Sequence, residues 1–281
     1  MTHARSPHPP LTRRSALGWL AAGTFGVAAA AVTGCSRRPD VMVTGQVDAV
    51  IATAYRDLAH AGMTQVNGLW GPGSVPLPVR LHLPRSATQW AQSTGQLGQF
   101  GPSGQFAAST VRRPGQEPVV VIHPDTWDAL RPEGRASVVT HELTHLAMGP
   151  SGSAPWWLTE GLAEYTAHSA FDGAPSEIAG SALTGLLARP PQGWPQPAAA
   201  SDPWQGYAAA WLACVFLADE VGDQAMLGLY AATRAGRPFD QVCPAVFDRS
   251  ASRLHRQWLD WLGSLGRPSP AASAQLLADP E

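Results

Sequence analysis

Two histidines four positions apart, with a glutamate beside the first, are the residues of this sequence best suited to chemistry. They are His141, Glu142 and His145, in a run whose apolar residues predict a buried helix. Residues i and i+4 lie on one face of a helix, so both imidazoles can bind one zinc ion, while Glu142 can reach a metal-bound water without taking a coordination position. Because unpaired charge in an apolar run is costly, a metal explains the cluster better than surface histidines do.

A catalytic zinc ion needs a third protein ligand and one open position. Met148 and Ser151 stand where a metzincin has Gly and His, which excludes that class. The segment 155–165 reads Pro-Trp-Trp-Leu-Thr-Glu-Gly-Leu-Ala-Glu-Tyr. It resembles the third-ligand segment of gluzincins, in which a Trp-Leu-x-Glu-Gly-x-Ala motif on the next helix supplies a glutamate to zinc. Aminopeptidase N-like enzymes and the smaller bacterial peptidase MA-like domains share this motif.

The resemblance implies a third ligand, a fold and an activity. Glu160 is the implied zinc ligand, in an α+β, zincin-like (gluzincin) peptidase MA-like domain over residues 45–265. That domain has a small N-terminal sheet with helices, followed by a helical C-terminal half. Only residues 138–165 carry specific motifs. The implied activity is peptide bond hydrolysis, and the absence of the Gly-x-Met-Glu-Asn motif of aminopeptidase N-like enzymes favours an endopeptidase.

The implied mechanism assigns further roles. Zinc lowers the pKa of a bound water toward about 7, and Glu142 takes the proton of this water as it attacks a peptide carbonyl. Related enzymes stabilise the oxyanion with a downstream Tyr or His, which makes Tyr207 the candidate, with packing at its helix start as the alternative. Related zincins bind an extended peptide along an edge strand, for which the predicted strand 106–111 is the candidate.

Four other polar residues near these motifs have ordinary structural interpretations. Glu164, one turn after Glu160, either holds a ligand histidine from behind or is a surface charge. His168 continues the same face and is interpreted as solvated. His123 at a strand end is interpreted as structural, and Tyr165 as a packing residue.

The N-terminus predicts export. Arg13-Arg14 precedes an apolar run over 17–32 and resembles a twin-arginine signal. Residues 32–35, Val-Thr-Gly-Cys, resemble a bacterial lipobox, in which Cys35 is lipidated. We therefore expect a signal peptide over 1–34, a tether over 35–44 and a lipid anchor on the extracytoplasmic face of the membrane. The alternative is an uncleaved transmembrane anchor, for which the run is short.

Composition limits the function classes. The net charge of −2 gives no basic excess for binding nucleic acid. No span follows residue 34, which argues against an intramembrane protease. Cys214 and Cys243 are either buried free thiols or, as export allows, a disulfide. The function is therefore expected to be peptide or protein hydrolysis, and the alternative is a non-catalytic zinc-binding lipoprotein that acts as a cell-envelope interaction module. The intact Glu142 argues against that alternative.

Periodicity predicts the elements that must position these residues. Alternating or continuous apolar runs predict strands over 76–83, 106–111 and 119–122. Apolar residues at helical spacing predict helices over 46–60, 136–148, 155–170, 206–221, 225–235 and 252–265. Gly62 is expected to end the first helix. Residues 91–105 are expected to be a loop, 190–203 a proline-rich connection and 266–281 a disordered tail.

Overall fold

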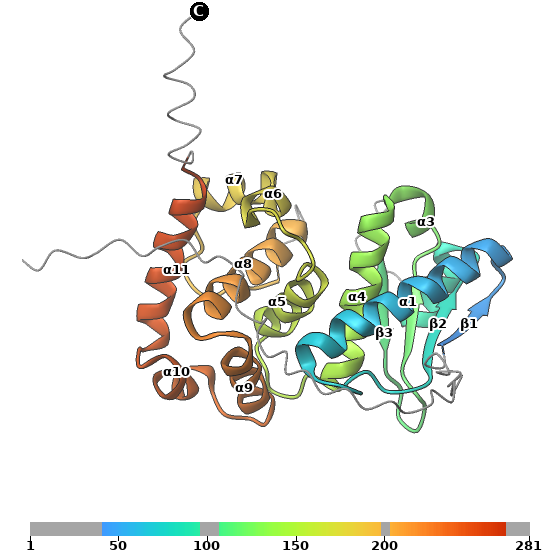
Figure 1. Ribbon diagram of the computed structural model, residues 1–281, viewed down its shortest axis with the longest axis horizontal. Helices are drawn as coiled ribbons and strands as arrows, with labels where there is room; N and C mark the ends of the chain where they lie inside the picture. The colour runs from blue at the N-terminus through green and yellow to red at the C-terminus, as the bar shows by residue number, and fades with distance from the viewer. Residues whose placement is uncertain (1–40, 96–106, 198–202, 268–281) are drawn as a thin grey trace, which may run out of the picture. The chain divides into compact units, whose positions relative to one another are not determined.

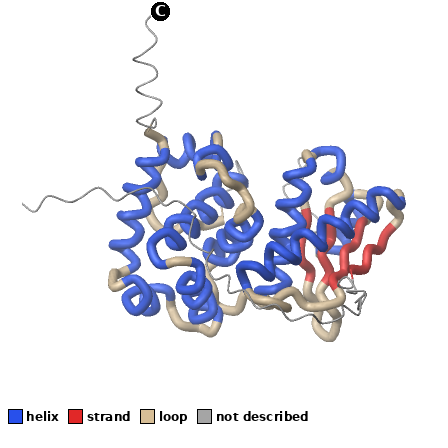
Figure 2. Tube along the Cα trace, in the orientation of Figure 1, coloured by secondary structure: helices blue, strands red, loops and turns tan. Residues whose placement is uncertain are grey.

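The computed structural model describes residues 41–95, 107–197 and 203–267 of the chain. In these ranges a four-stranded sheet comes first, and helices make up the C-terminal half (Figure 1). Figure 2 shows the strands together in one sheet, with helices elsewhere. The predicted α+β class is therefore confirmed. The predicted signal peptide and Cys35 lie outside the described residues, as do 35–40 of the tether and 268–281 of the tail. No helix within the described ranges is long and apolar enough to cross a membrane.

The sheet has the strand order β1-β2-β4-β3. Its strands are β1 (Val41–Gly45), β2 (Val79–Leu83), β3 (Ala108–Val111) and β4 (Val119–Ile122). The first three in spatial order are parallel, and β3 is antiparallel to β4, with Thr110 opposite Val120. The prediction that 41–44 belong to a tether is wrong, because they pair with β2. The run Val-Met-Val-Thr-Gly is too short to predict a strand without its partner. At the other side, β3 is an edge strand.

Helix α1 (Ala49–Trp70) is longer than predicted. Asp48 caps its start by accepting a hydrogen bond from Val50 N at 2.7 Å. The prediction that Gly62 ends the helix is wrong. A Cβ there would lie 2.9 Å from both Leu143 Cδ1 and Thr140 Oγ1, so the glycine permits close packing of α1 on helix α4 (Pro132–Met148). Tertiary packing has outweighed the weak helix propensity of glycine.

Helices α1 and α4 lie against the sheet (Figure 1). They share one hydrophobic cluster with it. Met63 from α1, Leu143 from α4 and Leu81 from β2 belong to it, all at most 3% exposed. Helix α2 (Ala87–Thr94) contacts β4 and β3. It occupies residues 91–94 of a segment expected to be a loop; Ser86 accepts a bond from Gln89 N as its cap. The rest of that segment, 96–105, and Phe106 lie outside the described residues.

The C-terminal half is helical. After the short helix α3 (Thr126–Ala129) and α4, it consists of α5 (Trp156–Ala167), α6 (Pro175–Ala179), α7 (Ser181–Ala188), α8 (Pro203–Val221), α9 (Asp223–Arg234), α10 (Phe239–Phe247) and α11 (Ala251–Leu265). The predicted helices over 155–170, 206–221, 225–235 and 252–265 correspond to α5, α8, α9 and α11. Helices α6, α7 and α10 are too short for a clear periodic signal.

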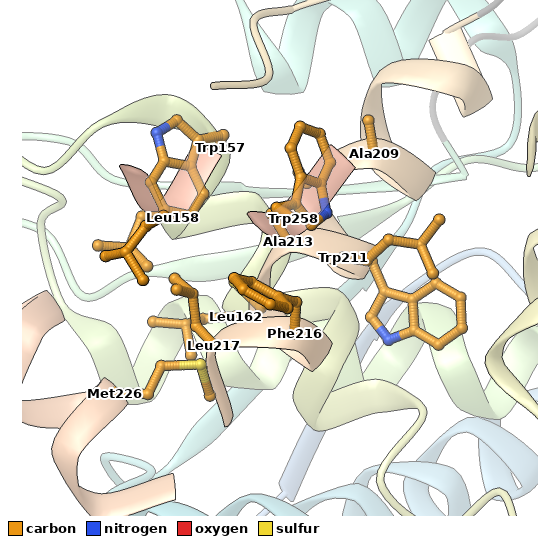
Figure 3. Close-up of a cluster of buried hydrophobic side chains, with 14 of the residues drawn as sticks. Trp157, Leu158, Leu162, Ala209, Trp211, Ala213, Phe216, Leu217, Met226 and Trp258 are labelled. Carbon is orange, nitrogen blue, oxygen red and sulfur yellow. The ribbon is translucent and has the colours of Figure 1, made fainter. Parts of the chain in front are cut away.

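A second hydrophobic cluster fills this half (Figure 3). Trp157 and Leu162 from α5, Phe216 and Leu217 from α8, and Trp258 from α11 are buried in it. Helices α5 and α8 pack closest at Gly161, where a Cβ would lie only 2.3 Å from the Ala210 carbonyl oxygen. This approach brings the start of α8 against the polar face of α5.

Candidate metal centre

Helix α4 carries both histidines of the predicted metal site. Pro132 and Glu133 occupy its first turn, where a proline needs no amide partner and an acid favours the helix dipole. Leu143 and Leu146 face the sheet-side cluster. His141 and His145 lie one turn apart on another face, with their Nε2 atoms 3.0 Å apart. The packing of the apolar face therefore fixes which way the two imidazoles point.

Helix α5 supplies the acidic residues. A glycine-containing turn after Met148 brings it back along α4, and Gly152 in this turn has φ +59°, which favours glycine. Glu160 and Glu164 are four residues apart and so share a face. Leu158 and Leu162 lie on the opposite side of the helix, in the C-terminal core, and Trp157 is buried in the same core.

Three side chains form a group that could hold a metal ion: His141, His145 and Glu160, whose ligand atoms all lie within 4.8 Å of one another. Glu160 Oε2 lies 3.3 Å from His141 Nε2 and 3.4 Å from His145 Nε2. A tetrahedral zinc site with ligand distances of about 2.1 Å separates neighbouring ligand atoms by about 3.4 Å. The geometry and the nitrogen–oxygen donor set thus fit a small divalent cation, and one coordination position remains for a substrate or water.

Behind the group, Glu164 links two histidines. Its Oε1 lies 3.0 Å from His141 Nδ1, in an ion-pair contact bent away from ideal hydrogen-bond geometry. Its Oε2 lies 3.2 Å from His168 Nε2, and the His168 ring packs against Trp211 with centroids 5.4 Å apart. A carboxylate at Nδ1 leaves Nε2 of His141 as the metal-facing nitrogen. The interpretation of His168 as solvated is wrong, because the ion pair and Trp211 cover it.

Electrostatic interactions within the group favour ionised glutamates and a protonated His141. Burial raises the pKa of both glutamates, but hydrogen bonds and charges of the histidines more than offset it. The pKa of Glu160 is consequently well below its usual range, and that of Glu164 falls to about 2. Burial lowers the pKa of His141, yet the charges and hydrogen bonds of Glu164 and Glu160 raise it well above its ordinary value. In the absence of a metal, a proton on His141 balances the anionic carboxylates.

Glu142 lies beside the group and outside it. Its side chain is 6% exposed, and its Oε2 accepts a 2.6 Å hydrogen bond from Thr110 Oγ1. The same hydroxyl lies 3.1 Å from the Glu142 carbonyl oxygen. Thr110 belongs to the edge strand β3, so the strand fixes the orientation of the glutamate.

Two further residues complete the surroundings. Tyr207 on α8 has its ring centroid 6.3 Å from that of His141 and 5.4 Å from that of Trp156. Burial raises the pKa of Tyr207, and the charges of Glu160, Glu142 and Glu164 raise it further, so the phenol keeps its proton. Arg112 on the end of β3 donates from Nη2 to the carbonyl oxygen of His145 at 2.7 Å.

These groups line one open cleft of about 760 Å³. Its walls come from β3, α4, the turn after α4, α5 and the start of α8. Trp204 adds an apolar surface that is 37% exposed. The lining residues include Thr110, Arg112, His141, Glu142, His145, Glu160, Glu164, His168 and Tyr207. The cleft is large enough to take a peptide or another small ligand against the histidine–glutamate group.

The structure brings six of the predicted site residues together around one cleft: His141, Glu142, His145, Glu160, Glu164 and Tyr207. Cys214 and Cys243 are buried, unbonded thiols, so of the two interpretations the structure has the free thiols. Burial raises the pKa of both, that of Cys243 to about 12 with help from Asp240. His123 and Tyr165 are structural as predicted: His123 packs against Trp90, and the Tyr165 hydroxyl donates to Asp223 at 2.7 Å.

Sequence reasoning missed Thr110 and Arg112. Thr110 lies on the predicted edge strand over 106–111, where it alternates with Val111, and Arg112 directly follows that strand. The period of a strand could have placed Thr110 and Arg112 on one face, but not opposite Glu142.

Comparison of the chain with protein-family models and with curated proteins finds no match in either.

Proposed function

We propose that the chain is a zinc-dependent peptide hydrolase of the gluzincin type, with His141, His145 and Glu160 as the zinc ligands. The observation that carries the proposal is the position of Glu142. It shares the cleft with the three ligand residues, forms no hydrogen bond or ion pair with their side chains, and is held by Thr110. A purely structural metal site has no use for a second, oriented carboxylate beside it.

The proposed zincin-like fold rests on the sequence motifs and on the helix pair. Helix α4 with its two histidines packs beside α5 with its glutamate, and the edge strand β3 packs against α4. This is the arrangement that the motif resemblance implies. The α+β class is compatible with it.

The chain's own residues account for the proton movements. Zinc, when bound, supplies a Lewis acid that polarises a peptide carbonyl and makes a nearby water acidic. Glu142 takes a proton from the attacking water and delivers it to the leaving amine. Tyr207, protonated and facing the same cleft, donates a hydrogen bond to the oxyanion. Glu164 holds His141 with Nε2 toward the metal.

The substrate is a peptide or protein segment in extended form. The edge of β3 that does not pair with β4 offers backbone groups for strand addition. The cleft is open, and its only acidic lining residues in the described part of the chain are Glu142, Glu160 and Glu164, which have roles at the metal group. This favours cleavage within a chain over removal of its first residue.

The substrate's location follows from the N-terminal segment. We propose export and a lipid on Cys35, which places the hydrolase on the extracytoplasmic face of the cell membrane. Mass spectrometry of the membrane fraction is expected to find a mature N-terminus at a diacylglyceryl-modified Cys35. A mature N-terminus elsewhere, or an intact residue 1, would contradict this part of the proposal alone.

The test of the hydrolase replaces Glu142 by Gln. The substitution keeps the size and the contact with Thr110 but removes the base, so the protein is expected to fold and bind one zinc ion. Cleavage of a mixed peptide library should fall by at least about a hundredfold, the usual contribution of a general base. Glu133→Gln, an exposed glutamate in the first turn of the same helix, is the matched control and should keep full activity.

Metal content is measured on the same samples. A zinc-loaded wild-type protein that cleaves no peptide in the library would favour a non-catalytic envelope module. Equal cleavage by the wild-type and Glu142→Gln proteins would place the chemistry elsewhere.

A further inference from the structure

One cationic side chain stands in the cleft without an acidic partner. Arg112 is the only arginine among the described lining residues, and the sequence contains no lysine. It follows Thr110 by two positions, directly after the last residue of β3, and both side chains line the same cleft. In extended backbone, Thr110, which holds Glu142, and Arg112 are about 6.8 Å apart along the chain. This is the length of two residues of an extended peptide.

The C-terminus of α4 fixes this side chain. Arg112 Nη2 donates to His145 O at 2.7 Å and to Leu146 O at 3.4 Å. The last carbonyls of a helix lack partners within the helix and carry its negative dipole end, so they hold a guanidinium well. A guanidinium has five N–H donors in a planar fork. Only Nη2 of Arg112 is engaged among the described residues, which leaves an oriented set of donors.

The carboxylates of the cleft are all engaged elsewhere. Glu142 accepts from Thr110, Glu160 contacts both ligand histidines, and Glu164 lies between His141 and His168. In the described part of the chain no carboxylate forms an ion pair with Arg112. An arginine that has no ion-pair partner and is oriented by the helix carbonyls can bind a carboxylate with two parallel hydrogen bonds.

A second arginine strengthens the local field. Arg234, at the end of α9, donates from Nε to Pro150 O at 2.9 Å, just beyond the helix end that holds Arg112. Its positive charge, after burial, lowers the pKa of Arg112, so the two guanidiniums interact electrostatically. The Tyr230 hydroxyl, which interacts with both charges, is buried and has no hydrogen-bond partner in the described chain. The region around Arg112, Arg234 and Tyr230 is thus rich in hydrogen-bond donors and poor in side-chain acceptors.

We propose that Arg112 binds a carboxylate of the substrate. The preferred substrates, if the proposed hydrolase function holds, are extended peptides with a carboxylate two residues from the scissile bond. That carboxylate is either an Asp or Glu side chain or the free C-terminus of the peptide. In the first case the chain is an endopeptidase selective for acidic segments, and in the second it removes short C-terminal fragments.

Binding is tested separately from hydrolysis. The Glu142→Gln protein, loaded with zinc, is titrated with acetylated, amidated alanine-rich octapeptides that carry one Glu at successive positions. The same peptides with Gln replace the carboxylate by an uncharged group of equal size, and a third set has a free C-terminal carboxylate. Dissociation constants are measured by nuclear magnetic resonance titration, which reports weak binding. At least one carboxylate peptide is expected to bind about tenfold more tightly than its uncharged counterpart.

Two arginine variants identify the side chain responsible. Arg112→Gln in the Glu142→Gln background should abolish the preference for the carboxylate. Arg113→Gln is the matched control, since Arg113 also donates to a backbone carbonyl, Ser93 O at 2.7 Å, but does not line the cleft. It should keep the preference. Because each result is a ratio of two affinities on one protein, partial unfolding of a variant does not change it.

The outcomes separate the two proposals. Equal binding of charged and uncharged peptides, including no binding of either, overturns the assignment of Arg112, and so does a preference that survives Arg112→Gln. A preference for Glu peptides identifies acidic side chains, and a preference for free C-termini identifies terminal carboxylates. If binding shows the preference but the wild-type protein cleaves none of these peptides, the hydrolase proposal fails while the carboxylate site stands.

Discussion

Replacing Gly161 by Ala tests whether close packing of α5 on α8 builds the site. Gly161 is buried and directly follows Glu160. A Cβ at this position would lie 2.3 Å from Ala210 O and 2.7 Å from both Ala210 C and Cys214 Sγ. Two of these three atoms are backbone atoms, so no rotamer change can remove the clash. The helices must separate by about 1 Å to reach ordinary contact, and interiors packed at crystal density resist this.

The expected magnitude follows from two opposing effects. Overpacking a core typically costs about 1–3 kcal/mol, and a backbone clash belongs at the upper end of that range. Alanine is a better helix former than glycine by about 1 kcal/mol, which offsets part of the cost. We therefore expect Gly161→Ala to lower the free energy of unfolding by about 2 kcal/mol, equivalent to a fall in Tm of about 4–8 °C.

The matched control is Gly228→Ala on α9, where a Cβ would meet no atom within 4 Å. It should leave stability unchanged or raise it by up to about 1 kcal/mol. Urea unfolding followed by tryptophan fluorescence measures both variants. The movement of α8 also displaces Tyr207 from His141, so Gly161→Ala should reduce peptide cleavage more than it reduces zinc content. A Gly161→Ala protein as stable as the Gly228→Ala protein would refute the argument from close packing.

Three other outcomes are expected. Glu160→Gln should weaken zinc binding far more than Glu164→Gln under mild chelation, because it removes an anionic ligand and the other removes only a partner of His141; equal retention by both would show the ligand assignment to be wrong. In the metal-free protein, the raised pKa of His141 contributes stability below about pH 6.5, and this stability is lost as the pH rises through the folded-state pKa. The lowered pKa of Glu164 contributes stability above about pH 4.3, and this stability is lost as the pH falls toward 2. Because zinc competes with protons for His141, the increase in Tm on adding zinc should grow between pH 6 and pH 8, and a constant or shrinking increase would contradict this. Thiol labelling of a chain in which Cys35 is replaced by Ser should modify both Cys214 and Cys243 after denaturation and neither before it; absence of labelling after denaturation would indicate a disulfide.

The part of the site that local sequence could predict is the part with a fixed helical period. The histidines of α4 lie one turn apart because any helix places i and i+4 together. Glu160 and Glu164 follow the same rule on α5. That the two helices meet does not follow from either period. Only the motif resemblance implied that Glu160 joins the two histidines.

The misplaced elements share a cause in tertiary structure. β1 is a strand because β2 pairs with it, and its five residues alone are too few to predict one. α1 continues through Gly62 because α4 packs against that glycine. Thr110 and Arg112 gain their roles from a helix that follows them by about thirty residues, at 142–146. His168 was wrongly assigned to solvent, because its contact with Trp211 on another helix does not follow from the local sequence.

The metal group also lies at the junction of two separate hydrophobic cores. The core that contains Leu143 and Leu146 belongs to the sheet, α1 and α4, and the core that contains Trp157 and Leu162 belongs to α5 and the later helices. His141 and His145 come from the first side and Glu160 from the second. A bound ion would therefore add a tie between the two cores, beside the packing of α4 on α5 and the hydrogen bonds from Gln65 and Trp70 of α1 to Thr166 of α5. In hydrogen exchange, chelation should lower amide protection unequally in the two cores and divide one unfolding transition into two.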